Sequence, residues 1–140
     1  MESENVAIVR RAYEAWQRMD MDGISAAWAP EIEWDLTHHD ETDDTIARGP
    51  AEVMALLAEW MRIWRAYAIE VRSYEPCGDH VLVVFDRRGL DRANAHLDRT
   101  VSHLWTLSHG RVLRIAAYSD PDEGRRAAGL VADDQVERGV

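Results

Sequence analysis

The sequence predicts an α+β fold, because apolar residues repeat at helical spacing in the first part of the chain and alternate like strands in the second. Helical spacing covers residues 6–19 and 53–64, with one alternating segment at residues 31–37 between them. Alternation then prevails from residue 68 to residue 119. Helices first and strands after them exclude a doubly wound parallel sheet, in which helices and strands take turns along the whole chain.

The first part of the chain is expected to hold two helices and a strand. Ser3 or Asn5 can cap the first helix, and residues 20–23 break it. A short second helix follows and ends at Pro30. Residues 31–37 alternate between apolar and polar side chains, which is typical of a half-buried strand.

The rest of the chain is expected to add a long helix, four strands and a short last helix. Residues 38–48 are expected to form a polar loop, and Pro50 then suits the first turn of the long helix, where its missing N–H costs nothing. Pro121 opens the last helix, which ends near Gly129. The strands are expected over residues 68–74 and 80–88, and in a hairpin over residues 99–120 with its turn at 108–110.

The composition favours a single domain whose partner is neither nucleic acid nor membrane. A chain of 140 residues is expected to form one domain over residues 1–140, with its core at about 5–130 and a frayed tail at 131–140. A net charge of −10 argues against nucleic acid and anionic membrane surfaces. Cys77 is the single cysteine, so no intrachain disulfide forms and a cytoplasmic location is expected. No apolar run reaches the length of a membrane span.

Three stretches of the chain, in this order and spacing, resemble the SnoaL-like group of the nuclear transport factor 2-like superfamily. They are residues 9–35 (VRRAYEAWQRMDMDGISAAWAPEIEWD), 46–60 (IARGPAEVMALLAEW) and 102–120 (SHLWTLSHGRVLRIAAYSD). The resemblance, which covers about residues 5–130, implies the ketosteroid isomerase-like fold. That fold is a cone in which a curved, mixed or antiparallel sheet wraps around a hydrophobic pocket closed by three helices of the N-terminal half. It also implies a homodimer and no cofactor.

The resemblance also implies which side chains face the pocket and which face the partner subunit. The pocket-facing side chains, expected to bind a substrate, are Trp16, Trp34, Leu36, Trp60, Trp64, Phe85, Arg87, Ser102, Leu104, Ile115, Ala117 and Ser119. The outer sheet face, expected to contact the second subunit, carries Val101, His103, Trp105 and Tyr118. A shift of one residue in the register of this strand would move His103 into the pocket.

Two kinds of function remain open. The catalytic positions of the ketosteroid isomerases fall on Ala12, Leu36 and Ser102, none of which can act in the same way, and the catalytic triad of the limonene epoxide hydrolases is also replaced. The first hypothesis is a cofactor-independent isomerase or cyclase that acts by proton transfer on an apolar, carbonyl-bearing substrate. The second is a non-catalytic module of the same fold that binds a small apolar molecule or dimerises.

For the enzyme hypothesis, Arg87 and Ser102 are candidate donors to an oxyanion, and His38 or Asp35 is the candidate proton carrier. A buried Arg87 would need a carboxylate or an anionic ligand; the alternative is a frayed strand in which it reaches water. Residues 38–44 offer histidine and carboxylate groups of the types that bind metals. Adjacent acidic residues are more typical of a solvated loop at the pocket mouth, so no metal is expected.

Overall fold

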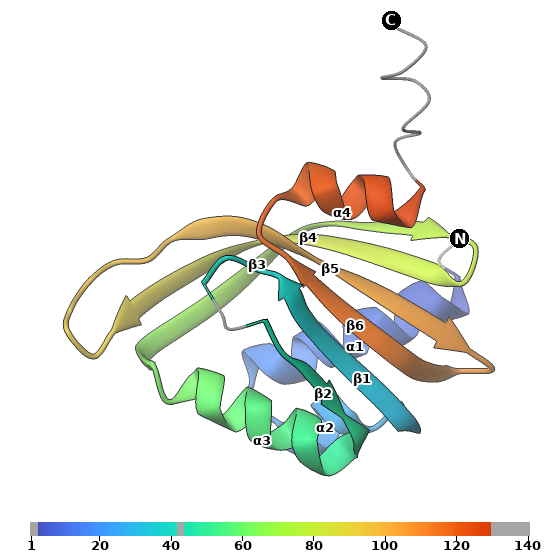
Figure 1. Ribbon diagram of the computed structural model, residues 1–140, viewed down its shortest axis with the longest axis horizontal. Helices are drawn as coiled ribbons and strands as arrows, with labels where there is room; N and C mark the ends of the chain where they lie inside the picture. Colours follow the sequence, from blue (N-terminus) through green and yellow to red (C-terminus); the bar gives the residue numbers. More distant parts are fainter. Residues whose placement is uncertain (1–2, 42–43, 130–140) are drawn as a thin grey trace, which may run out of the picture.

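The computed structural model describes residues 3–41 and 44–129 of the chain. The helices within these residues are α1 (Glu4–Gln17), α2 (Met21–Ser25), α3 (Gly49–Met61) and α4 (Pro121–Ala128) (Figure 1). The strands are β1 (Trp28–His38), β2 (Ile46–Arg48), β3 (Trp64–Cys77), β4 (His80–Asp91), β5 (Arg99–Ser108) and β6 (Arg111–Tyr118). The tail expected at residues 131–140 lies outside the described residues.

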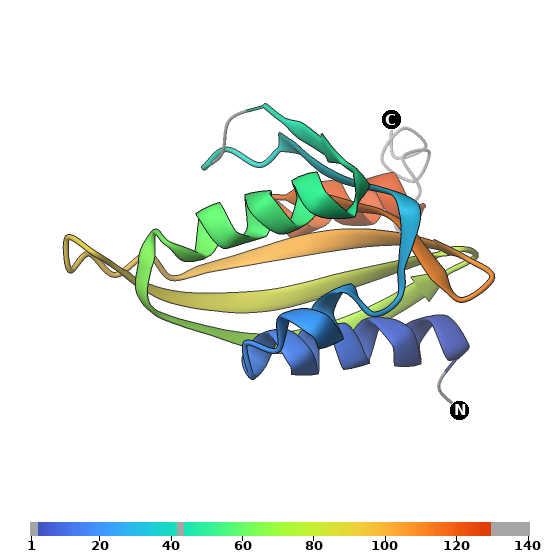
Figure 2. The ribbon, with the colours of Figure 1, turned by 90° about the horizontal axis from the view of Figure 1, so that it is seen from below.

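The six strands form one open, curved sheet in the order β2-β1-β6-β5-β4-β3. Neighbouring strands are antiparallel, except that β1 and β6 are parallel. The helix α1 runs along β3 and β4 on one side, and α3 packs on β1 and β2 (Figure 2). The opposite face of β4, β5 and β6 is covered by α4 (Figure 1). The predicted α+β class, with a curved mixed sheet covered by helices, is therefore confirmed.

The helix ends follow the expected capping residues. The side chain of Ser3 accepts a hydrogen bond from the backbone N–H of Val6 at 3.1 Å, which satisfies one free donor of the first turn. Pro50 lies in the first turn of α3, as predicted. Gly129 ends α4 in the left-handed conformation, with φ of 78°, which costs a glycine little because it has no Cβ atom.

The start of β1 differs from the sequence interpretation. The second helix was expected to end at Pro30, but it ends at Ser25, and β1 begins at Trp28 with Pro30 inside it. A proline cannot donate a ladder hydrogen bond, so a strand tolerates it only where pairing is irregular. The register between β1 and β6 shifts between Trp28 and Glu33, which is the irregularity that accommodates Pro30.

The orientation of β5 also differs from the sequence interpretation. The antiparallel register places His103 opposite Ala117 and Ser102 opposite Tyr118. Side chains directly opposite each other lie on the same face of a sheet, so His103 shares the inner face with Ala117. The inward set on β5 is therefore Val101, His103 and Trp105, and the outward set is Ser102 and Leu104. The expected orientation of β5 was the reverse, so it was wrong, whereas Ala117 faces inward as predicted.

This reversal removes most of the expected dimer contact. Val101, His103 and Trp105 are buried inside the subunit, with His103 only 6% exposed. They cannot meet a second copy of the chain while the domain is folded. Tyr118 does lie on the outer face, but it is 5% exposed and its ring stacks on His38, with centroids 4.7 Å apart. A homodimer stays a prediction, and a contact surface on the outer face would have to use other residues.

The last helix lies close to the outer face of the sheet at Gly124. At Gly124 an added Cβ atom would overlap the hydroxyl of Ser102 and lie 3.1 Å from a methyl carbon of Leu82. The Ser102 hydroxyl is buried and has no hydrogen-bond partner among the described residues. Glycine is therefore required at position 124 by the close approach of helix and strand.

We expect Gly124→Ala to lower the free energy of unfolding by about 1–2 kcal/mol, because overlap with Ser102 outweighs the better helix propensity of alanine. Ser102→Ala alone should be neutral or slightly stabilising, since it removes an unpartnered buried hydroxyl. The double variant Gly124→Ala/Ser102→Ala should recover most of the free energy of unfolding that Gly124→Ala alone loses. Urea denaturation of the four proteins measures these differences. An unchanged cost of Gly124→Ala in the Ser102→Ala background would contradict the close approach.

Candidate functional site

A cavity of about 370 Å³ lies between the inner face of the sheet and the helices α1 and α3. Its wall is largely apolar and rich in aromatic rings. These rings belong to Trp16, Trp34, Trp60, Tyr67 and Phe85. The titratable residues that also line it are His39, Glu41, Glu59, Tyr67, Arg87 and His103.

Many of the side chains expected in the pocket do line this cavity. They are Trp16, Trp34, Leu36, Trp60, Phe85, Arg87 and Ala117. Others lie elsewhere: Trp64 and Ile115 are buried in the surrounding core, Ser119 follows the last residue of β6, and Ser102 and Leu104 are on the outer face. That the lining residues bind a substrate stays a prediction.

A hydrogen-bond chain links Trp105, Tyr13 and His103 behind the cavity wall. The indole N–H of Trp105 donates to the Tyr13 hydroxyl oxygen at 3.0 Å, and that oxygen lies 2.7 Å from Nδ1 of His103. All three side chains are buried, so the Tyr13 hydroxyl hydrogen needs an acceptor. Nδ1 of His103 is that acceptor, and the imidazole proton is therefore on Nε2. This tautomer follows from the hydrogen-bond network.

The imidazole of His103 and the phenol of Tyr13 are both uncharged at neutral pH. Burial, reinforced by the neighbouring His39, lowers the pKa of His103 to about 3. Burial also raises the pKa of the Tyr13 hydroxyl well above its usual value. The chain therefore ends in a neutral imidazole whose Nε2–H is a hydrogen-bond donor, and His103 lines the cavity.

In the wall of the cavity, Arg87 is paired with Glu41. The guanidinium donates from Nη1 and Nη2 to the two carboxylate oxygens of Glu41 at 2.7 and 3.0 Å. It also donates from Nε and Nη2 to the backbone oxygen of Leu97 at 3.2 and 3.0 Å. Its carbon lies 5.8 and 5.1 Å from the ring centroids of Trp60 and Trp64. With Arg87 only 2% exposed, the expected alternative of a frayed, solvated strand is wrong, and Glu41 supplies the carboxylate a buried arginine needs.

A second arginine holds the same stretch of chain. Arg99 donates to the two carboxylate oxygens of Asp40 at 2.6 and 2.8 Å, and its Nη1 lies 3.2 Å from Glu41. The backbone N–H of Asp40 donates to the Ser119 hydroxyl at 2.7 Å. Burial raises the pKa of Glu41, but hydrogen bonds and charge from Arg87, with smaller contributions from nearby cations, bring it below the usual value. Asp40 and Glu41 are therefore held by ion pairs with Arg99 and Arg87 and do not extend freely into solvent.

His39, Asp40 and Glu41 have the types of ligand that bind metal ions, and their ligand atoms all lie within 4.8 Å of one another. Asp40 and Glu41 are already bound by the guanidinium groups of Arg99 and Arg87. Two cations thus occupy the carboxylates that a metal would need, so the chemistry of this cluster does not fit a metal site. His39 instead lines the cavity, and burial lowers its pKa despite the nearby Glu41.

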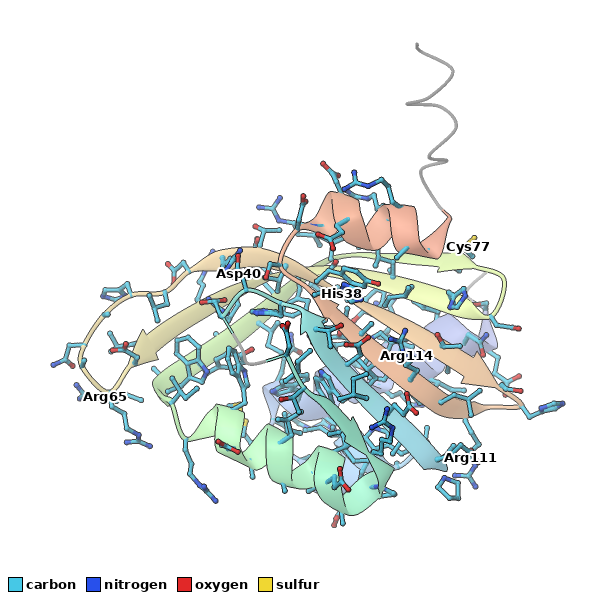
Figure 3. The ribbon with its side chains drawn as sticks, viewed as in Figure 1. His38, Asp40, Arg65, Cys77, Arg111 and Arg114 are labelled. Atoms are coloured by element: carbon cyan, nitrogen blue, oxygen red, sulfur yellow. The ribbon has the colours of Figure 1, made fainter. Side chains whose placement is uncertain are left out.

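The other candidate catalytic residues lie on the outer face of the sheet. Asp35 accepts hydrogen bonds from the backbone N–H and hydroxyl of Thr37 at 2.8 and 2.6 Å, pairs with Arg114, and lies 3.7 Å from His38. Figure 3 shows His38 at the far end of β1 and Arg114 partway along β6. Because strand residues alternate between faces, Asp35 is opposite to Trp34, which lines the cavity. Asp35, His38 and Ser102 therefore cannot reach a ligand in the cavity, and their expected roles are corrected.

Sequence reasoning assigned His103 to the wrong face and treated His39 and Glu41 as parts of a solvated loop. The available signal for His103 was its alternation with Val101 and Trp105, which makes one apolar face of β5. That alternation shows that Val101, His103 and Trp105 share one face of β5, but it does not show whether that face points toward the cavity or away from it. No local signal pointed to Glu41, because its partner Arg87 is 46 residues away in the sequence.

The family model for the SnoaL-like domain matches residues 9–115, which is most of the chain. The chain belongs to the SnoaL-like family. No curated protein matches this SnoaL-like domain. None of its described helices has the length and apolar character needed to cross a membrane.

Solved structures similar to this SnoaL-like domain share its fold. A nuclear transport factor 2-like protein of unknown function from Burkholderia pseudomallei has a TM-score of 0.77 and 23% identity over 91% of this chain and 98% of its own. A putative SnoaL-like polyketide cyclase from Jannaschia has a TM-score of 0.74 and 20% identity over 91% and 92%. A Mycobacterium tuberculosis protein in complex with estradiol-17beta-hemisuccinate has a TM-score of 0.70 and 13% identity over 86% and 97%.

Proposed function

We propose that this SnoaL-like domain binds a small, mostly apolar molecule and places an acceptor oxygen of that molecule, such as a carbonyl, at Nε2–H of His103. The observation that carries the proposal is the hydrogen-bond chain from Trp105 through Tyr13 to Nδ1 of His103. It leaves Nε2–H as the donor for a ligand in the cavity that His103 lines. A neutral donor suits a neutral acceptor, because neither group brings a charge that must be desolvated.

The cavity dimensions and lining support the same ligand class. A volume of about 370 Å³ lies at the small end of the range for small-molecule pockets. Aromatic walls contribute apolar contact area, while a few polar groups set the orientation of the ligand. Two proteins of similar fold are described as a putative polyketide cyclase and as a complex with estradiol-17beta-hemisuccinate, a compound that joins an apolar ring system to oxygen-bearing groups, one of them a carboxyl group.

The test compares α-tetralone with tetralin, which has the same rings but no carbonyl. We expect the wild-type protein to bind the ketone about tenfold more tightly, because one buried hydrogen bond contributes about 1–1.5 kcal/mol. His103→Phe should abolish this preference while leaving tetralin binding almost unchanged. Tyr13→Phe should reduce it, since the tautomer of His103 would no longer be fixed. Isothermal titration calorimetry measures all the affinities. Equal binding of both compounds by the wild-type protein would contradict the proposal.

A second candidate function is proton transfer, which is favoured by the neutral imidazole of His39 in the same cavity wall. In this reading the lone pair on Nδ1 of His39, which accepts a hydrogen bond from the backbone N–H of Glu41 at 3.2 Å, takes a proton from the carbon next to the carbonyl. The electron pair of the broken C–H bond moves to the carbonyl oxygen. His103 then donates a hydrogen bond to the enolate oxygen. The proton returns from His39 to carbon, so no cofactor is consumed.

Exchange of the carbon-bound protons of α-tetralone for deuterium in D₂O, followed by NMR, tests this second candidate. Wild-type protein should accelerate the exchange, and His39→Asn should lose the acceleration while still binding the ketone. Exchange at the buffer rate in the presence of saturating wild-type protein would leave ligand binding as the function.

A further inference from the structure

We propose that Glu41 determines ligand specificity: by occupying the guanidinium of Arg87, it restricts the cavity to uncharged ligands. The inference rests on the proposed function, because it concerns the ligand class of the same cavity. Arg87 and Glu41 both line the cavity and form a two-point ion pair there, with N–O distances of 2.7 and 3.0 Å.

The surroundings of Arg87 explain why Glu41 is the decisive partner. The rings of Trp60 and Trp64 lie against the guanidinium, and the Leu97 carbonyl accepts from Nε and Nη2. These contacts hold the guanidinium in place, but none of them brings a negative charge. Glu41 contributes a carboxylate, which is the same chemical group that an acidic ligand would bring.

An acidic ligand therefore competes with a carboxylate that is already attached to the protein. Glu41 is held close by the chain and by Arg99, so its effective concentration at Arg87 is high. A ligand carboxylate in the cavity would lose water and meet the negative charge of Glu41 without gaining a free cation. Arg87 alone would attract anionic ligands, but with Glu41 bound to it the cavity selects against them.

Replacing Glu41 with a neutral residue should reverse this selectivity. In Glu41→Gln the buried guanidinium loses its counter-charge and becomes available to a carboxylate. We expect the variant to bind tetralin carboxylate at least about tenfold more tightly than the wild-type protein does, as is usual for a charge-assisted hydrogen bond. Its affinity for α-tetralone should stay within about threefold of the wild-type value, because that ligand carries no charge.

Glu59→Gln is the matched control. Glu59 also lines the cavity, and within residues 3–41 and 44–129 it forms no ion pair with an arginine. Its removal changes the net charge by the same amount without exposing Arg87, so no gain in carboxylate binding is expected. The double variant Glu41→Gln/Arg87→Met should lose the gain, since the cation itself is gone. If Glu41→Gln does not fold, Glu41→Ala gives the same comparison.

Isothermal titration calorimetry with both ligands separates this inference from the proposed function. Failure of the wild-type protein to bind α-tetralone contradicts the proposed function. A Glu41→Gln protein that binds α-tetralone but gains no affinity for tetralin carboxylate overturns the role of Glu41. An equal gain in affinity for tetralin carboxylate in Glu59→Gln would show general charge repulsion and would also overturn the role of Glu41. Equal affinity of the wild-type protein for α-tetralone and tetralin carboxylate would overturn it as well.

Discussion

Lowering the pH from about 7 to about 5 should reduce the free energy of unfolding of the wild-type protein by about 2 kcal/mol more than that of His103→Phe. The reason is that the folded protein keeps His103 neutral. Its pKa is about 3 in the folded state, because of burial and the nearby His39, and near the ordinary value of 6.5 in the unfolded chain. Histidine protonation thus favours the unfolded state.

The direction of the effect follows from which state binds the proton first. Above about pH 6.5 the imidazole is neutral in both states, so His103 has no effect on the pH dependence. As the pH falls below that value, the unfolded chain takes up a proton that the folded chain refuses, and stability is lost. The loss ends near pH 3, where the folded state is protonated as well. Over the whole range it amounts to about 5 kcal/mol.

Urea denaturation of both proteins at the two pH values measures this difference. The chosen pH range lies above the ordinary carboxyl pKa of 4.5 from which the stabilising carboxylates Glu41 and Glu75 begin to lose their contribution. His39, whose pKa is also lowered, is present in both proteins, so its own contribution largely cancels, because burial and not its charge is the main cause of the low pKa of His103. Parallel pH dependence in the two proteins would contradict a neutral His103 in the folded state.

Gly89→Ala should lower the free energy of unfolding by about 3 kcal/mol, because the ring of Trp64 lies directly on the backbone at Gly89. A Cβ atom at position 89 would overlap the ring edge and lie 2.8 Å from Cη2. The ring cannot easily move aside, since it packs on Trp60 and Tyr67, with centroids 5.5 and 5.4 Å away, and on Arg87. The substitution therefore disturbs the aromatic groups that hold Arg87.

A double-mutant cycle with Trp64→Leu identifies the cause of this loss. In the Trp64→Leu background a smaller side chain faces position 89, so Gly89→Ala should cost less by about 2 kcal/mol than in the wild-type protein. Thermal and urea denaturation give the four stabilities. Additive costs for the two substitutions would mean that the backbone of β4, and not the indole ring, resists the new methyl group.

Local patterns predicted most of the secondary structure of this protein. Ser3, Pro50 and Gly129 end or begin helices where expected, because each acts through its own backbone conformation or a nearby N–H group. Residues 31–37 lie within β1, as their alternation indicates, with Trp34 facing the cavity. Pro30 was misread as a helix end because the irregular pairing that tolerates it inside β1 is not a local property.

The candidate site was predicted only in part. The apolar wall around Trp34 and Phe85 was expected from strand alternation and from the resemblance to the family. The polar contacts of the site were not expected, because Tyr13 is on the apolar stripe of the first helix and its partner His103 is 90 residues away in the sequence. Asp35, an acidic residue that the sequence offered as a candidate, turned out to be on the outer face.

The sequence by itself determined the order of the helices and of every strand except β2, which lies in the stretch expected to be a loop. It also determined their approximate ends and the two alternating sets of side chains on β5. Only the tertiary structure decided which of those sets faces the cavity, through the pairing of His103 with Ala117. It likewise decided that Arg87 meets Glu41. The physical reason is that periodicity and capping arise from neighbours along the chain, whereas sheet register and ion pairing between distant segments depend on how the whole chain packs.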